Sequence, residues 1–245
     1  MASKFDTHAL LSVLKRINLA GTNDECVAVV EKDSVYMRAI DSQQLIFATA
    51  TQKVDGASDV FGKEIGIGSI NTIIKFLDDS DNVKIEKRDS RIVFRRHDGG
   101  INAQTIPVEE VVSKVDKPIR AEQKLLDAAT VGVVVDAAFV QGLMQYTSLV
   151  PCDLITLSHE GNKVNVTGIR NNDKDAFIFK IGVKNGATTE KVSTTVFTAP
   201  FLKAVTALAA SDFKEPMLRW SANGPALLCG SRLNFWAVTS MIDKV

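Results

Sequence analysis

The segments FDTHALLSVLKRI (5–17) and VDAAFVQGLMQYTSLV (135–150) decide the fold, because each opens the same series of elements. Each segment predicts an amphipathic helix, which short alternating strands follow. A second helix comes next, GSINTIIKFLDD (68–79) or APFLKAVTALAA (199–210), and then more strands. The expected helix starts, Asp6, Ser69, Asp136 and Ala199, are separated by about 63, 67 and 63 residues. The chain is therefore expected to contain two similar domains.

All four segments are predicted to bury one helical face and to expose the other. The apolar stripe of the first helix is Leu10, Leu11, Leu14 and Ile17. The second helix has Ile70, Ile73, Ile74 and Leu77 in these positions, and the last has Phe201, Leu202, Val205 and Leu208. The outward-facing cations are Lys15, Arg16, Lys75 and Lys203. The third helix differs: its predicted inner face is Phe139, Val140, Leu143 and Tyr146, and its outer face is the uncharged set Gln141, Gln145 and Ser148.

The rest of each half reads as short strands interrupted by turns such as EKDS, HEGN and SANGP. Few helices among many strands indicate an α+β protein in which helices cover one face of antiparallel sheets. The expected domains are residues 1–107 and 133–245, joined by a charged, proline-containing connector over 108–132.

Composition limits the possible functions. Lys and Arg number 29, as do Asp and Glu, so any nucleic-acid binding must come from a local patch. Three separated cysteines without ligand spacing predict buried or half-buried thiols rather than a metal site or disulfides. No apolar run is long enough to cross a membrane and no signal peptide is visible, so we expect a soluble intracellular protein.

No catalytic motif is present, and we expect neither an enzyme nor a cofactor. GIGS at 66–69 lacks the remaining features of a phosphate loop and is interpreted as a turn. His8, His97 and His159 are expected on the surface. The basic hairpin KIEKRDSRIVFRRHD (84–98) is interpreted as a solvated strand face that could add to DNA attraction.

Four segments together resemble the two-domain DNA sliding clamps, the family of proliferating cell nuclear antigen and the T4-like phage clamps. They are FDTHALLSVLKRI, RAIDSQQLIFATA (38–50), IGSINTIIKFLDDSDNVKIE (67–86) and SANGPALLCGSRLNFW (221–236). They occur in the family's order and cover almost the whole chain. The resemblance implies a homotrimeric ring of pseudo-six-fold symmetry that encircles duplex DNA and acts as a polymerase processivity factor at replicating DNA, in a nucleus, cytoplasm or nucleoid.

The resemblance also implies the roles of particular residues. Lys15, Arg16, Lys75 and Lys203 would contact DNA; Gln141 and Gln145 depart from the family, which often has basic residues there. Subunits would join through INAQTI and DAFIFKIGV, with interface residues Ile101, Ala103, Phe177, Phe179 and Ile181. Packing inside a sheet explains the alternation in the second strand equally well.

The implied partners are double-stranded DNA, a DNA polymerase, a clamp loader and further copies of the chain. Partner motifs would enter a pocket lined by Ile40, Leu45, Phe47, Leu125, Leu126, Pro225, Trp236, Ala237 and Val238. Trp236 and Thr239 stand where the family often has tyrosine and proline, which leaves the shape of the pocket open. A buried core role remains the alternative for Phe47 and Trp236.

Three other functions remain open at this point. The chain could be a monomeric polymerase accessory factor with the same duplicated fold, although zero net charge disfavours it. It could be a clamp-like scaffold subunit that assembles with non-identical chains. An enzyme that uses the basic hairpin is the weakest alternative, because no acid, base or nucleophile can be assigned to it.

Overall fold

The computed structural model describes residues 5–32, 34–79, 83–111, 124–161, 163–170, 173–182, 188–211, 213–231 and 234–238. Helices pack on antiparallel sheets throughout this part of the chain, which confirms the predicted α+β class. The chain divides into two compact units between residues 119 and 120. Among the described residues, none of the helices has both the length and the apolar character that a membrane span requires.

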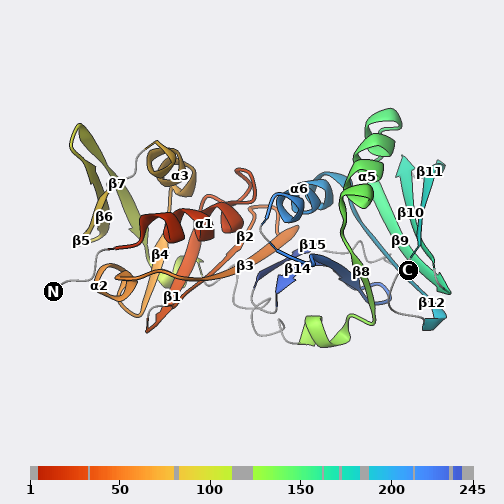
Figure 1. Ribbon diagram of the computed structural model, residues 1–245, viewed down its shortest axis with the longest axis horizontal. Helices are drawn as coiled ribbons and strands as arrows, with labels where there is room; N and C mark the ends of the chain where they lie inside the picture. Colours follow the sequence, from red (N-terminus) through yellow and green to blue (C-terminus); the bar gives the residue numbers. More distant parts are fainter. Residues whose placement is uncertain are drawn as a thin grey trace. The chain divides into compact units, whose positions relative to one another are not determined.

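The first unit contains a sheet whose strands follow the order β5–β6–β7–β4–β1–β2–β3 (Figure 1). The strands are β1 (Cys26–Glu31), β2 (Ser34–Ile40), β3 (Ile46–Lys53), β4 (Glu64–Ile67), β5 (Lys84–Arg88), β6 (Arg91–Arg96) and β7 (Gly99–Ile106). The helices are α1 (Thr7–Asn18), α2 (Ala57–Phe61) and α3 (Ile70–Asp78). Helices α1 and α3 pack against each other, α1 on β2 and β3 and α3 on β7.

The second unit has two sheets, ordered β15–β14–β13–β8 and β11–β10–β9–β12. Their strands are β8 (Val131–Val134), β9 (Leu154–Gly161), β10 (Lys163–Arg170), β11 (Asp173–Gly182), β12 (Thr188–Phe197), β13 (Met217–Trp220), β14 (Ala226–Ser231) and β15 (Asn234–Val238). Helices α5 (Ala137–Leu149) and α6 (Thr198–Ala209) contact each other, α5 on β11 and α6 on β12, β14 and β15.

Matching aspartates begin the first long helix of each unit. An Asp6 carboxylate oxygen accepts a hydrogen bond from the Ala9 backbone N–H at 2.9 Å, and Asp136 accepts one from Phe139 at 2.8 Å. Each carboxylate satisfies a backbone donor that has no partner within the helix, which favours a helix start at that residue. The starts predicted from Asp6 and Asp136 are therefore confirmed.

The buried helical faces also largely follow the prediction. Leu10, Leu14 and Ile17 of α1 are at most 1% exposed, and Phe201, Val205 and Leu208 of α6 are fully buried. Leu11, Ile74 and Leu202, predicted on the same faces, are only partly buried. In α5, burial is confined to Phe139 and Leu143. Tyr146, predicted on the inner face, is 37% exposed, so that assignment was wrong.

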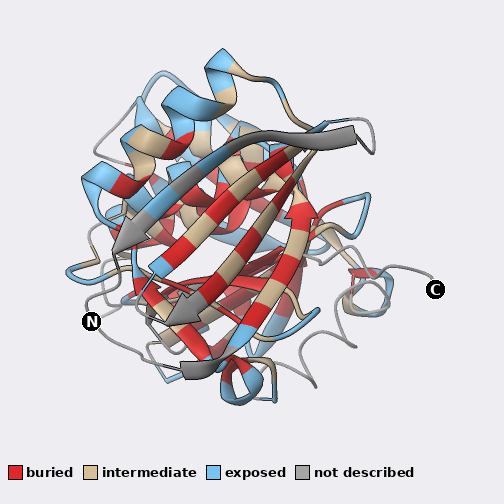
Figure 2. Ribbon diagram, turned by 90° about the vertical axis from the view of Figure 1, so that its right-hand side faces the viewer, coloured by how far each residue is buried: buried red, intermediate tan, exposed pale blue. Residues whose placement is uncertain are grey.

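His159 is fully buried, which contradicts its predicted surface position. It follows Ile155 and Leu157 at alternate positions of β9, and both are fully buried too. Alternate residues of a strand point to the same side of a sheet. Figure 2 shows the resulting alternation of buried and intermediate residues along the four-stranded sheet.

Two short elements lie where the sequence indicated turns or a connector. Gly66 belongs to β4 and pairs with Ile106 of β7, so the interpretation of all of GIGS as a turn was wrong. A Cβ atom at Gly66 would clash with the Ile106 carbonyl oxygen, which explains the glycine. In the expected connector, residues 108–111 and 124–128 are helical and Val131 already belongs to β8; residues 112–123 lie outside the described part.

Candidate nucleic-acid interface

Three of the predicted DNA-binding residues lie on the adjacent helices α1 and α3. Lys15 and Lys75 are exposed, and Arg16 is partly buried. Lys15 Nζ lies 2.6 Å from Asp78 Oδ1 at the end of α3, and Arg16 Nη1 donates to Gln52 Oε1 of β3 at 3.4 Å. The structure therefore brings these cations onto one helical layer, with two of them already engaged by protein acceptors.

The fourth predicted cation, Lys203, is exposed on α6. Its neighbour α5 carries no Asp, Glu, Lys or Arg from Ala137 to Leu149, and Gln141, Gln145 and Ser148 are exposed. The neutral outer face predicted for this helix is confirmed. The helical layer of the second unit thus offers less positive charge than that of the first.

The hairpin of β2 and β3 holds the first group of predicted pocket residues. Ile40 pairs with Phe47 across the hairpin, and Leu45 lies in the turn between them. Asp41 shapes this turn: its Oδ1 accepts the backbone N–H groups of Leu45 and Ile46, each at 2.6 Å. Ile40 and Leu45 are partly exposed, whereas Phe47 is only 4% exposed.

The remaining predicted pocket residues belong to the second unit. Leu125 and Pro225 are partly exposed, and Leu126 is buried. Trp236, Ala237 and Val238 all lie in β15 and are also buried. Burial of Phe47 and Trp236 favours the core role that the sequence left as an alternative. The accessible members of the set are the partly exposed residues Ile40, Leu45, Leu125 and Pro225. Thr239 lies outside the described residues.

The predicted joining strands occupy different positions in their sheets. Strand β11 is the terminal strand of its sheet, with β10 as its hydrogen-bonded neighbour. In β7, residues 99–104 pair with β6, and residues 105 and 106 pair with β4. Within the described residues, β11 therefore has one edge without a paired strand, and so does the 99–103 part of β7 on the side away from β6.

Register relates the predicted interface residues to the cores. In the register of β10 and β11, the partners of Phe177, Phe179 and Ile181 are Gly168, Val166 and Val164. These three β10 residues are buried. Ala103 is 2% exposed and Ile101 is partly exposed. Ala103 is therefore a core residue rather than part of an exposed contact face.

The two most exposed of the large apolar side chains in the described part of the chain were not predicted. Leu149 at the end of α5 is 68% exposed, and Ile178 of β11 is 50% exposed. The buried residues of α5 are Phe139 and Leu143, and Leu149 lies beyond them at the end of the helix. That position was the sequence signal for its exposure. Such residues contribute to association surfaces when they gather near an open strand edge.

The three thiols match the predicted environments: Cys26 and Cys229 are buried and Cys152 is partly buried. Burial raises the pKa of Cys26 to about 12. Burial also raises the pKa of Cys229 to about 11, although nearby Arg219 lowers it. In the described part of the chain, no group of His, Cys, Asp and Glu side chains has the arrangement of a metal site.

Comparisons with known proteins identify the fold. No protein-family model matches the chain, and no curated protein matches it in sequence. Among solved structures, it is similar to A. fulgidus PCNA bound to the C-terminal region of FEN-1, with a TM-score of 0.69, 13% identity and 100% coverage of both chains. Thermococcus kodakaraensis PCNA gives a TM-score of 0.64, 14% identity and coverage of 98% of this chain and 99% of that one.

A bacterial clamp shows the same likeness over part of its length. The DNA polymerase sliding clamp of Bacillus subtilis gives a TM-score of 0.73 with 14% identity over 98% of this chain, which spans 64% of that chain. The chain has the sliding-clamp fold over both of its units.

Proposed function

We propose that the protein is a DNA sliding clamp, a homotrimeric ring that encircles duplex DNA and tethers the replicative polymerase. The observation that carries the proposal is the end-to-end correspondence with PCNA, in which both chains are covered completely. A correspondence of both units, in order, supports a shared architecture better than a match of one domain would. Because the identity is only 13%, the likeness supports the fold, and the proposed function needs support from charge and exposed strand edges as well.

The helical layers have the charge that sliding requires. Phosphate contacts must be weak and independent of base sequence, because strong base contacts would stop movement along DNA. Lys15, Lys75 and Lys203 are exposed on helices of a protein with no formal net charge. We infer that these residues and Arg16 attract the DNA backbone, while enclosure by the ring provides retention.

Ring assembly would use the open strand edges. An unpaired edge invites pairing with another chain, and ring closure removes such edges. The edge of β11 and the 99–103 part of β7 lie in different units, so they could join head to tail between copies. Exposed Ile178 and Leu149 would be covered by such a contact.

Partner proteins would dock on the β2–β3 hairpin of the first unit. The PCNA of A. fulgidus is bound to the C-terminal region of FEN-1, which is a precedent for capture of a short protein segment by this fold. The half-buried Leu45 provides the sharpest test, because its side chain is not part of the fully buried core. Leu45→Ala should weaken polymerase stimulation while leaving subunit assembly intact; unchanged stimulation would remove Leu45 from the docking site.

The proposed protein acts inside the cell at replicating DNA, with a clamp loader as a further partner, and performs no covalent chemistry. A monomeric accessory factor and a subunit of a mixed assembly are the competing functions. Native mass spectrometry separates all three. A sliding clamp requires a species of three times the 26.6 kDa chain mass, whereas a single chain at micromolar concentration, or assembly only with other chains, would support a competitor.

A further inference from the structure

One face of β5–β6–β7 carries a concentration of cations that the proposed clamp function does not use. Strand register places Arg88 of β5 opposite Arg91 of β6, and Lys84 opposite Arg95. Because side chains two residues apart share a face, these four cations lie on the same side of the sheet. We call this set, with Val93 and Asn102 between and beside them, the arginine face.

The arginine face lies on the side of the sheet opposite the core. The intervening residues Ile92 and Phe94 are at most 1% exposed, and Arg96, also in this alternate series, stacks on Phe76 of α3 at 4.2 Å. Helix α3 therefore covers the other side of the sheet. The arginine face is a surface distinct from the helical layer proposed to meet DNA.

Cation pairs directly across neighbouring strands destabilise a sheet. Glu86 offsets one of them, because its carboxylate lies 2.9 Å from Arg88 Nη2. Within the described residues, Lys84, Arg91 and Arg95 have no ion-pair partner. Glu86 lies between Lys84 and Arg88 on the same face, so one carboxylate offsets part of the repulsion among four cations, and an added anion would offset more of it.

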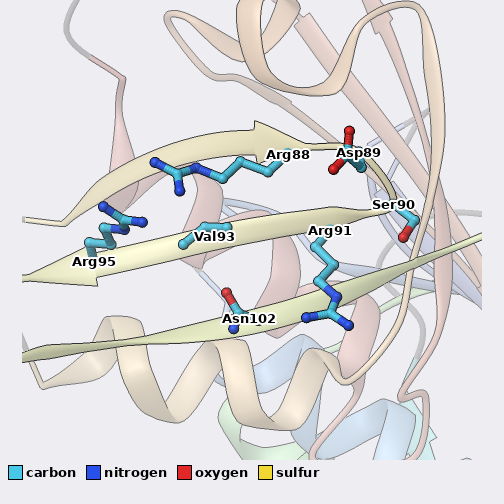
Figure 3. A pocket seen from close by; sticks show the side chains of 7 residues that line it. All are labelled: Arg88, Asp89, Ser90, Arg91, Val93, Arg95 and Asn102. Carbon is cyan, nitrogen blue, oxygen red and sulfur yellow. The ribbon is translucent and has the colours of Figure 1, made fainter.

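The arginine face also has the shape of a binding site. Its arginines, together with Val93 and Asn102, line an open cavity of about 470 Å³. In Figure 3, Arg88 and Arg95 extend toward each other from adjacent strands, and Arg91 extends across β7. Val93 is only 7% exposed although it belongs to the outer face, which indicates that the aliphatic stems around it form a covered floor.

Guanidinium groups match carboxylates and phosphates through paired hydrogen bonds. Arg91 and Arg95 are four residues apart on one strand, a separation of about 13 Å. An extended peptide with two carboxylates four residues apart has the same spacing. Asp89, Ser90 and Asn102 complete the lining, which contains no aromatic side chain on which a nucleic-acid base could stack.

We propose that the arginine face binds an extended acidic segment of a partner protein, with glutamates or aspartates four residues apart. This surface goes beyond the proposed clamp function and does not depend on ring formation. Because α3 covers the opposite side of the sheet, it could act while DNA occupies the helical layer.

The test measures fluorescence anisotropy of a labelled eight-residue peptide with glutamates at its second and sixth positions. Binding should be saturable, should weaken with salt and should be lost when both glutamates are glutamines. The double variant Arg91→Ala, Arg95→Ala should weaken binding at least tenfold. Lys87→Ala removes a cation from the other face of β5 and should change affinity less than twofold, and thermal melting checks that each variant folds.

Two outcomes would overturn the proposal. One is equal binding of the glutamate and glutamine peptides, or equal binding by the wild type and the folded double variant. The other is tighter binding of a ten-nucleotide oligothymidine than of the peptide, dependent on the same arginines, which would assign the face to nucleic acid. Because monomer and ring both carry the face, failure here leaves the mass measurement of the clamp unaffected.

Discussion

Lys15 of α1 and Asp78 of α3 form an ion pair, with 2.6 Å between Nζ and Oδ1. The side chains are 50% and 43% exposed, so water and salt screen the attraction. The pair connects helices α1 and α3 and also neutralises a cation proposed to attract DNA. A phosphate group arriving at Lys15 must compete with Asp78.

Asp78→Asn should therefore strengthen DNA attraction. It removes the competing carboxylate while keeping the shape of the side chain, and its cost in unfolding free energy should be on the order of 0.5 kcal/mol or less. Equilibrium binding to a short duplex should tighten about two- to fivefold at low salt, since one phosphate contact becomes fully available. Unchanged or weaker binding by the folded variant would show that Lys15 does not meet phosphate.

Replacing Lys15, Arg16, Lys75 and Lys203 together by alanine should weaken DNA binding at least tenfold and reduce its salt dependence. Each lost phosphate contact lowers the slope of log affinity against log salt concentration by about 0.9. Subunit assembly should remain intact because the exposed lysines contribute little to the cores. The control variant Lys163→Ala, Lys191→Ala removes exposed cations from β10 and β12, and an equal loss of binding there would contradict a specific role for the helices.

Asp41→Ala should destabilise the first unit by about 1–3 kcal/mol, because the buried N–H groups of Leu45 and Ile46 lose their acceptor. Asp41→Asn keeps one oxygen acceptor and should cost less. Urea unfolding gives the difference in free energy. Equal stability of the wild type and Asp41→Ala would mean that the turn keeps its geometry without the carboxylate.

The pKa of Cys26, which burial raises to about 12, gives a prediction for alkaline pH. Between the ordinary thiol pKa near 9 and this value, the unfolded thiol loses its proton while the folded one retains it. The unfolding free energy should therefore fall as pH rises from about 9 toward 12. The melting temperature of Cys26→Ala should fall less steeply with rising alkaline pH than that of the wild type. Cys152→Ala is the control and should behave like the wild type. Parallel curves of melting temperature against pH for all three proteins would contradict this role of Cys26.

Self-association should depend on exposed Ile178 of β11 and on exposed Leu149 at the end of α5, the helix that contacts β11. Leu149→Glu combined with Ile178→Glu places charge where a subunit contact would exclude water, which is strongly unfavourable. Native mass should shift from trimer to single chain, whereas Gln141→Glu, an exposed change on the same helix, should leave the trimer intact. A trimer that survives the double change would exclude this surface from the contact.

Local signals explain which parts of the fold could be predicted. The aspartates at 6 and 136 mark helix starts through a contact within three residues, so sequence alone suffices. His159 could also have been placed in the core, because it continues the alternate positions of Ile155 and Leu157. The neighbouring turn sequence HEGN instead favoured a surface position.

Other features depend on contacts between distant segments. Strand β4 has only four residues, which is too short for its alternation to be distinguished from a turn in the sequence. Its pairing with β7, some 40 residues later, is what identifies it as a strand. Tyr146 continues the apolar stripe of α5 in the sequence but is 37% exposed. Burial on this helix depends on its contacts with α6 and β11, which the sequence does not show. The basic hairpin could be seen in the sequence, but the opposition of Arg88 and Arg91 required the observed register.

Enclosure of DNA can be measured directly with a linear duplex fixed to a bead at one end. Protein threads over the free end, that end is capped by a bulky bound protein, and the beads are washed at moderate salt. A ring predicts retention that depends on the cap and release as soon as a restriction enzyme cuts the duplex. Equal retention with and without the cap, unchanged by cutting, would show that the protein grips DNA and would contradict the clamp.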